Sequence, residues 1–289
     1  MHVRLASDKA LPSPSEHQRA ILAFIRSGVG HGVVRATAGS GKTTTLVQVA
    51  HSLPRDLRVC FLAFARDAAT ELRTRLPVGV GAHTVHSVGL RTLRSYLKKR
   101  KVELGKVNPR KYRDLIKAEL GEVKLGFGVS DKALKPCEDY LRDLVLYARL
   151  NLTNTKDPSE VRVLAVRYNL RPPGDTALED ELHVRLRSIL RDGTRLALRG
   201  DLDYPDMIYV PHILNLPPPQ YDFVCVDEAQ DYSALALEFT MQLVSDGGRL
   251  LFVGDPRQSI FGFAGADTDA LERIVRRSDA TVLPLSVTY

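Results

Sequence analysis

The sequence has few cysteines and no long apolar run. Its 289 residues include three cysteines, Cys60, Cys137 and Cys225. Because these lie far apart, without a Cys-x-x-Cys pair, the spacing argues against a disulfide scaffold, a zinc ribbon and an iron–sulfur cluster held by this chain alone. No apolar run approaches the roughly 20 residues of a membrane-spanning helix, and residues 1–16 lack the apolar centre of a secretory signal. We therefore expect a cytoplasmic protein without a membrane partner.

Positive charge is concentrated in one segment. The whole chain carries a formal net charge of +7, whereas residues 91–125 alone hold twelve Lys or Arg against four Asp or Glu, a net +8. A basic patch of this kind is typical of proteins that bind a polyphosphate partner. A solvated helix face is the alternative, and charge alone does not decide between the two.

Five short apolar runs are separated by helical patterns, which predicts an α/β fold. The runs lack the alternation of half-exposed strands, so we expect buried strands of a parallel sheet flanked by helices. The expected strands are Gly32–Ala36, Leu57–Phe64, Phe223–Asp227, Leu250–Gly254 and Thr281–Leu285. The first helix is expected to run from Pro14 to about Ser27, with Ser13 as its cap and Glu16 completing a capping box. Further helices are expected near 42–53, 66–76, 233–245 and 267–277.

The middle of the chain has a different residue pattern. Residues from about 91 to 200 show helical patterns, many charges and no convincing buried strand, and Asp131–Leu150 and Leu178–Arg191 are the clearest amphipathic stretches. We therefore expect an inserted, mostly helical subdomain over 91–200. The α/β domain is expected to consist of 1–90 and 201–289.

A glycine-rich loop joins the first expected strand to the next helix. Gly39 and Gly41 allow a tight turn in which backbone N–H groups point at phosphate oxygens, and the helix N-terminus adds positive potential. Lys42 supplies a charge for the β- and γ-phosphates, and the Thr43 hydroxyl can ligate Mg²⁺. The pattern departs from the usual one at its first position, and a chance Gly/Ser/Thr loop is the alternative. We predict that ATP is bound by Ala36, Thr37, Ala38, Gly39, Ser40, Gly41, Lys42, Thr43 and Thr44.

Two acidic residues end the expected strand near position 225. Asp227 at the strand tip can hold the Mg²⁺ shell, and Glu228 can polarise the water that attacks the γ-phosphate. A carboxylate pair in this position is also common as a structural cap or ion-pair site. Together with the loop at 36–43, the pair predicts a nucleotide site that catalyses ATP hydrolysis.

Seven segments, in order, resemble the motifs of superfamily 1 helicases of the UvrD/Rep/PcrA type. They are SEHQ (15–18), ATAGSGKTTTL (36–46), FLAFARDAATELRTRL (61–76), TVHS (84–87), DYPDMI (203–208), VDEAQD (226–231) and LFVGDPRQSIFGFAGA (251–266). The resemblance spans almost all of the chain and implies a P-loop NTPase fold of the RecA-like type. It also implies that Gln18 binds the adenine edge and that Gln258 contacts the γ-phosphate. The alternatives are a solvated helix residue and a loop-capping amide.

The same resemblance implies DNA contacts by five residues, Phe64, Thr84, His86, Phe261 and Phe263. The three phenylalanines are expected to line a single-strand groove, where stacking contributes about 1–3 kcal/mol per base. Core packing is the alternative for Phe64 and Phe261, and a role at a helix start is the alternative for His86.

Three positions depart from the pattern of these helicases near the groove. Ala65 stands where Asn or Thr is usual, Ala264 where many relatives have Arg, and Phe263 where Trp is commoner. These changes affect the expected DNA contacts and leave the ATP site intact.

The resemblance identifies the chain as the first motor half of an ATP-dependent DNA helicase, with single-stranded DNA or a single/double-strand junction as its partner. In these helicases an arginine follows the segment that TVLPLSVTY (281–289) resembles. We therefore expect a second motor domain downstream or in trans, and weak hydrolysis by residues 1–289 alone. A nucleotide-gated nucleic-acid-binding module without motor activity is the alternative function. An unrelated P-loop enzyme such as a kinase does not explain the segments at 226–231 and 251–266.

Overall fold

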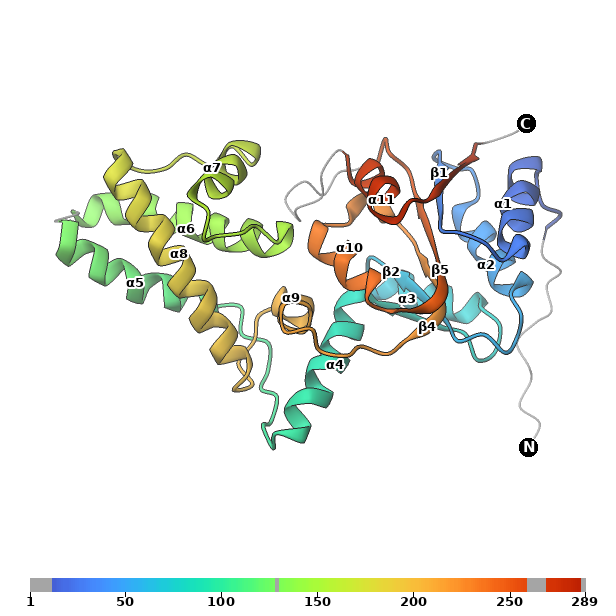
Figure 1. The fold of residues 1–289 in the computed structure, drawn as a ribbon, viewed down its shortest axis with the longest axis horizontal. Coiled ribbons are helices and arrows are strands. Elements are labelled where there is room, and N and C mark those ends of the chain that lie inside the picture. Colours follow the sequence, from blue (N-terminus) through green and yellow to red (C-terminus); the bar gives the residue numbers. More distant parts are fainter. Residues whose placement is uncertain (1–11, 128–129, 259–268, 287–289) are drawn as a thin grey trace.

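The computed structural model describes residues 12–127, 130–258 and 269–286. These residues form two lobes, an α/β lobe and a helical lobe, joined through helices α4 and α9 (Figure 1). None of the helices in the described residues is long and apolar enough to cross a membrane.

A six-stranded sheet forms the centre of the α/β lobe. Its strand order is β3-β2-β4-β5-β1-β6 and every neighbouring pair is parallel. The strands are β1 (Gly32–Ala36), β2 (Val59–Ala63), β3 (Gly81–Thr84), β4 (Tyr221–Val226), β5 (Val244–Gly254) and β6 (Thr281–Leu285). The predicted α/β fold with a parallel sheet flanked by helices is therefore confirmed, and β3 is a strand that the apolar pattern did not predict.

Helices cover both faces of this sheet. One face packs against α1 (Glu16–Ser27), α2 (Lys42–Ser52) and α3 (Arg66–Arg75). The other packs against α4 (Val85–Lys99), α10 (Ala234–Met241) and α11 (Ala270–Ser278). Successive strand residues serve opposite faces, because Val33 belongs to the second core and Val34 to the first. Burial on both faces explains why the strands are continuous apolar runs.

The cap of α1 differs from the expected one. Helix α1 begins at Glu16, and its cap is Ser15 rather than Ser13. The Ser15 hydroxyl accepts a hydrogen bond from the Gln18 backbone N–H at 3.3 Å, and the Gln18 side chain accepts one from the Ser15 N–H at 2.9 Å. The reciprocal pair closes over three residues, so the partner of the capping box is Gln18 and Glu16 lies inside the first turn.

The helical lobe has a core of its own. It consists of α5 (Lys111–Phe127), α6 (Asp131–Asn151), α7 (Pro158–Arg167) and α8 (Thr176–Ala197), which pack around one apolar cluster. A smaller cluster joins α4 to α9 (Asp206–Ile213) and to the end of α8. The expected boundary at residue 91 falls inside α4, so this helix belongs to both regions.

Candidate nucleotide site and nucleic-acid interface

The glycine-rich loop lies between the end of β1 at Ala36 and the start of α2 at Lys42. Gly39 and Gly41 have φ of +73° and +82°, in the left-handed region that favours glycine. A Cβ at Gly41 would also lie 3.4 Å from the Gln18 amide nitrogen. The Thr37 N–H donates to the Leu285 carbonyl at 3.0 Å, so the loop is fixed to the edge strand β6. These residues hold the loop in a tight turn.

The start of α2 is open to an anion. Its N-cap is Gly41, and within the described residues no side chain caps it and no acidic residue occupies its first turn. The first N–H groups of a helix have no intrahelical partner and carry the positive end of the helix dipole. This end of α2 can therefore bind phosphate oxygens.

The glycine-rich loop meets the tip of β4. The Lys42 Nζ lies 2.7 Å from Glu228 Oε2, although 186 positions separate the two residues. Asp227 is placed by its own backbone, because its N–H donates to the Leu62 carbonyl of β2 at 2.8 Å. The Glu228 N–H in turn donates to Asp227 Oδ1 at 3.0 Å, and Glu228 adopts a positive φ of +52°. The structure thus brings together the lysine and the two acids that the sequence singled out.

Negative charge is crowded at this tip. Burial, together with the charge of Glu228, raises the pKa of Asp227 to about 6. The same two causes raise the pKa of Asp231 to about 6, and Asp231 Oδ1 is buried without a hydrogen-bond partner among the described residues. Buried carboxylates that lie close together favour the binding of a cation. Carboxylates with a shifted pKa are also common at functional sites. In the described residues, no group of three or more His, Cys, Asp or Glu is arranged to hold a metal ion. Mg²⁺ does not need one, because it takes one or two carboxylates and completes its shell with water and phosphate oxygens.

A chain of hydrogen bonds links Glu228 to the end of β5. The Gln230 amide nitrogen donates to Glu228 Oε2 at 2.7 Å, and the Asp255 N–H donates to Gln230 Oε1 at 3.0 Å. Gln258 joins the same chain, because its amide nitrogen donates to Asp255 Oδ2 at 2.9 Å. Gly254 lets Gln230 approach, since a Cβ there would lie 2.6 Å from Gln230 Oε1. Through this series of hydrogen bonds, Gln258 is connected to Glu228 by way of Asp255 and Gln230.

Sequence reasoning assigned no role to Gln230 or Asp255, although both lie inside segments that it quoted. Gln230 is 3% exposed and Asp255 is 1% exposed. Gln230 lies in the short 3-10 helix η1 (Ala229–Asp231) and Asp255 directly follows β5. Their burial, which the sequence does not show, identifies them, because buried polar groups are almost always hydrogen-bonded.

Gln18 lies beside the glycine-rich loop and is buried rather than solvated. Its amide oxygen accepts from the Ser15 N–H, and its amide nitrogen donates to Thr45 Oγ1 at 3.0 Å. The Thr45 hydroxyl donates to the Gly41 carbonyl at 3.0 Å. Gln18 therefore supports the loop directly, and an adenine contact would use the remaining hydrogen-bonding positions of its amide.

Three of the expected DNA-contacting residues lie near the carboxyl ends of β2 and β3. Phe64 directly follows β2 and is partly buried. Thr84 is the N-cap of α4, with its hydroxyl accepting from the Ser87 N–H at 3.2 Å. The His86 ring stacks on Tyr204 with the centroids 4.0 Å apart, and burial lowers the pKa of His86 to about 4. Phe261 and Phe263 lie outside the described residues.

The basic segment 91–125 is only partly a surface feature. Lys111 is fully buried and forms an ion pair with Asp206, which is also fully buried. Lys98, Lys99 and Arg100 are exposed at the end of α4. The positive charge that this segment presents to a partner is therefore smaller than the net charge of +8 counted from its sequence.

Known proteins resemble this chain over most of its length. A family model described as the UvrD/REP helicase N-terminal domain matches residues 15–278. The chain is 26% identical over 268 residues to the ATP-dependent DNA helicase PcrA of Staphylococcus aureus, an alignment that covers 84% of this chain and 33% of that protein. It is 24% identical over 246 residues to F-box DNA helicase protein 1 of Schizosaccharomyces pombe, covering 82% of this chain and 27% of that protein. The chain thus spans about a third or less of the length of these relatives.

Proposed function

Because the chain belongs to the UvrD/REP helicase N-terminal domain family, we propose that it is the ATP-binding motor half of a DNA helicase. The observation that carries this proposal is the 2.7 Å contact between Lys42 and Glu228, which joins the glycine-rich loop to the acidic strand tip. A single triphosphate between these two elements would reach both the open start of α2 and the carboxylates.

Each residue of the site has a distinct part in ATP hydrolysis. The loop N–H groups of residues 37–44 hold the phosphate oxygens, and Lys42 leaves Glu228 to neutralise the β- and γ-phosphates. Thr43 and Asp227 would hold Mg²⁺, which would offset the negative charge of the phosphates. Glu228, once free of Lys42, accepts a proton from the attacking water. Gln258 touches the γ-phosphate, and its link through Asp255 and Gln230 reports the loss of that group.

We place single-stranded DNA or a single/double-strand junction across the carboxyl ends of β2 and β3. Phe64, Thr84 and His86 are the contacts proposed there, and the exposed lysines and arginines of 91–125 add contacts to phosphates. Phe261 and Phe263, which lie outside the described residues, are proposed as further DNA contacts. In this proposal the inserted subdomain over 91–200 lies against the DNA, while 1–90 and 201–289 form the motor domain. A second motor domain supplies the arginine for efficient hydrolysis, so residues 1–289 alone hydrolyse ATP slowly.

The test is calorimetric binding of Mg²⁺–ATP to four proteins. Lys42→Ala is expected to lose binding, because the loop then lacks its only charge for the phosphates, whereas Glu228→Gln is expected to bind and to lose hydrolysis. Lys132→Ala is the matched control, because Lys132 is exposed on α6 in the helical lobe. Equal ATP affinity of Lys42→Ala and Lys132→Ala would contradict the proposal.

DNA binding is tested separately by its salt dependence. Phosphate contacts release counterions, so the affinity for a short single-stranded oligonucleotide should fall steeply between low and moderate salt. An affinity that barely changes over this range would contradict the basic surface proposed over 91–125.

A further inference from the structure

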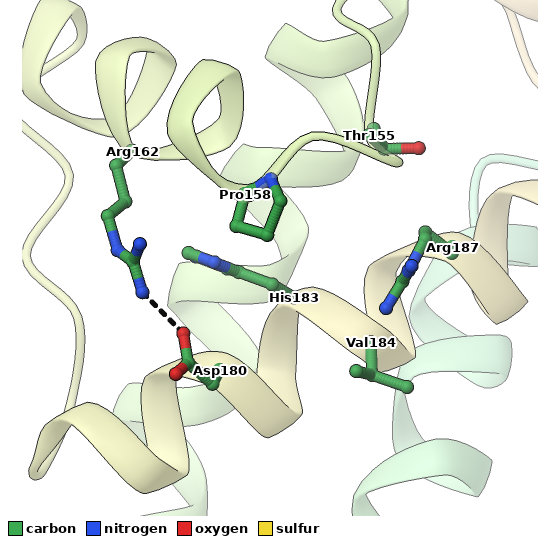
Figure 2. Close-up of a pocket in the computed structure, with 7 residues that line it drawn as sticks. All are labelled: Thr155, Pro158, Arg162, Asp180, His183, Val184 and Arg187. Atoms are coloured by element: carbon green, nitrogen blue, oxygen red, sulfur yellow. Dashed lines mark hydrogen bonds and ion pairs between the residues drawn. The ribbon is translucent and has the colours of Figure 1, made fainter.

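The pocket between α7 and α8 in the helical lobe is balanced in charge. Figure 2 shows the Arg162 guanidinium next to the Asp180 carboxylate, and Arg162 also contacts Glu179. Arg187 adds a second positive charge to the lining, so two arginines face two acids and no net charge selects an ionic ligand. A more specific arrangement lies at the nucleotide site, around the buried side chain of Gln230.

The orientation of the Gln230 side chain is fixed by a backbone group. The Asp255 N–H is a donor only, and it donates to Gln230 Oε1 at 3.0 Å. The other end of the amide, Nε2, therefore faces Glu228 and donates to Oε2 at 2.7 Å. A reversed amide would place donor against donor at Asp255 and acceptor against acceptor at Glu228. Because Gln230 and Asp255 are both buried, water does not replace these two hydrogen bonds.

Gly254 makes room for this amide. A Cβ at Gly254 would lie 2.6 Å from Gln230 Oε1 and 3.0 Å from the Gln230 backbone nitrogen. Any other residue at this position would therefore displace the glutamine. Gln230 follows β4 and Gly254 ends β5, so the contact ties together the ends of two neighbouring strands.

Two donors share one oxygen of Glu228. Lys42 Nζ and Gln230 Nε2 each lie 2.7 Å from Oε2, whereas Oε1 accepts no hydrogen bond from the described residues. In the proposed function Lys42 turns to the phosphates, and Gln230 is then the side chain that still holds Oε2. The nearby carboxylates of Asp227 and Asp231 repel Glu228, so this remaining donor is needed to keep its direction.

We propose that Gln230 is a positioning residue for ATP hydrolysis: it holds Oε2 of Glu228 and leaves Oε1 to accept the proton of the attacking water. The water oxygen bonds to the γ-phosphorus as the bond to the bridging oxygen breaks, so ADP and phosphate leave and Oε1 holds the proton. Gly254 supports this role because it admits the amide. The reaction itself rests on the proposed function, whereas the hydrogen bonds are those of the chain.

The first test compares single-turnover hydrolysis with calorimetric binding of Mg²⁺–ATP in the full chain. Gln230→Met removes the donor at similar length, and Gly254→Ala displaces the amide without changing it. In both variants the rate should fall about tenfold to a hundredfold. The ATP affinity should stay unchanged, because neither side chain belongs to the glycine-rich loop. Gln48→Met is the matched control, since Gln48 is a second buried glutamine, which donates to the Pro12 carbonyl at 3.0 Å.

The second test needs no turnover. It follows the side-chain amide of Gln230 by ¹H–¹⁵N NMR in the full chain. In the free protein this amide should exchange slowly with water, and its signal should shift in Glu228→Gln because the acceptor is then uncharged. When Mg²⁺ and a non-hydrolysable ATP analogue bind, the slow exchange should persist while the Lys42 ammonium changes its partner.

Three results would overturn the proposal. Equal hydrolysis rates in Gln230→Met and Gln48→Met would show that Glu228 does not depend on the amide. A parallel loss of ATP affinity and rate in Gln230→Met would show that Gln230 only maintains the fold. Fast exchange of the wild-type amide in the presence of the analogue would show that Gln230 releases Glu228, whether or not the variants fold.

These failures are distinct from failure of the proposed function. In each of them the wild type would still bind Mg²⁺–ATP and Lys42→Ala would not. A wild-type chain that does not bind Mg²⁺–ATP would contradict the proposed function, and the role of Gln230 with it.

Discussion

Two lysine–carboxylate pairs in this molecule have opposite surroundings. Lys42 and Glu228 join the glycine-rich loop to β4, and their side chains are 14% and 34% exposed. Lys111 and Asp206 join α5 to α9, and their side chains are both 0% exposed. The first pair is open on one side to an incoming ligand, whereas the second is enclosed by protein. We call the first the open pair and the second the sealed pair.

The sealed pair belongs to a network in which the partners are mutually satisfied. Arg149 of α6 contacts Asp203 at 2.8 Å and Asp206 at 3.2 Å, and the Tyr112 hydroxyl donates to Asp206 at 3.1 Å. The backbone N–H groups of Asp203 and Asp206 each donate to the other's carboxylate. Residues from α5, α6 and the start of α9 therefore meet at one point, and helix α9 itself lies between the two lobes (Figure 1). This network fixes how the helical lobe is attached to α9.

The open pair lies in a region where one buried carboxylate oxygen, that of Asp231, has no hydrogen-bond partner among the described residues. A raised carboxyl pKa is common to both regions, because burial raises the pKa of Asp227, Asp231 and Asp206 alike to about 6. Comparing the two pairs indicates that the degree of burial decides whether a lysine–carboxylate pair stabilises the fold or stays available to a ligand. A closed ion pair maintains an arrangement of helices, and a half-open one is kept ready for exchange with a ligand.

The largest expected effect follows from breaking the sealed pair. Asp206→Ala leaves the Lys111 ammonium buried without its carboxylate, and removing one partner of a buried pair costs about 3–5 kcal/mol of unfolding free energy. Urea unfolding followed by circular dichroism measures this loss. A change below about 1 kcal/mol would show that water reaches Lys111, and the contrast between the two pairs would fail.

A pH dependence is expected at His86, which stacks on Tyr204 next to the sealed network. Burial lowers the pKa of His86 to about 4 in the folded chain, from 6.5 in the unfolded chain. The unfolded state therefore binds more protons between these values, so this contribution to stability is fully present above pH 6.5 and is lost as the pH falls toward 4. We expect the loss to be about 1–3 kcal/mol.

His86→Phe keeps an aromatic ring against Tyr204 and removes the titration. The difference in unfolding free energy between pH 7.5 and pH 4.5 should therefore be smaller in His86→Phe than in the wild type. Equal differences in the two proteins would show that the His86 ring is hydrated.

Breaking the open pair should have a small effect on stability and a large one on binding. Lys42→Ala is expected to change the unfolding free energy by no more than about 1 kcal/mol, because both side chains reach solvent. The same variant should lose ATP affinity. A loss of stability comparable with that of Asp206→Ala would show that Lys42 maintains the fold as well as binding the ligand.

The sheet was largely predictable from the sequence because burial on both faces gives continuous apolar runs. Strand β3 was missed because its four residues, Gly-Ala-His-Thr, are mixed in polarity and it lies at the edge of the sheet, where only Ala82 and Thr84 are buried. The cap of α1 was placed two residues early because Ser13 and Ser15 offer the same hydroxyl. The side chain of Gln18, which bonds back to Ser15, decides between them.

The proximity of the residues in the candidate nucleotide site was predictable for a different reason. Lys42, Asp227 and Glu228 lie at the carboxyl ends of strands, and in a parallel sheet these ends meet at one edge. The sealed network was not predictable, because Lys111 lies in a basic run that resembles a solvated face. Its partner Asp206 is 95 positions away in the sequence, and only the folded structure shows that both side chains are fully buried.

The smallest expected effect concerns a third pair, at the surface. Arg35 at the end of β1 contacts both carboxylate oxygens of Glu272 on α11 at 2.7 Å, and the two side chains are 38% and 49% exposed. Its geometry is as good as that of the sealed pair, and it also connects two elements. Glu272→Ala should nevertheless change the unfolding free energy by less than about 1 kcal/mol, because both charges remain hydrated when the pair is broken. Urea unfolding of Glu272→Ala beside Asp206→Ala therefore tests burial directly, since the distances are similar and the exposure differs. If both variants lost the same amount of stability, geometry rather than burial would set the strength of these pairs.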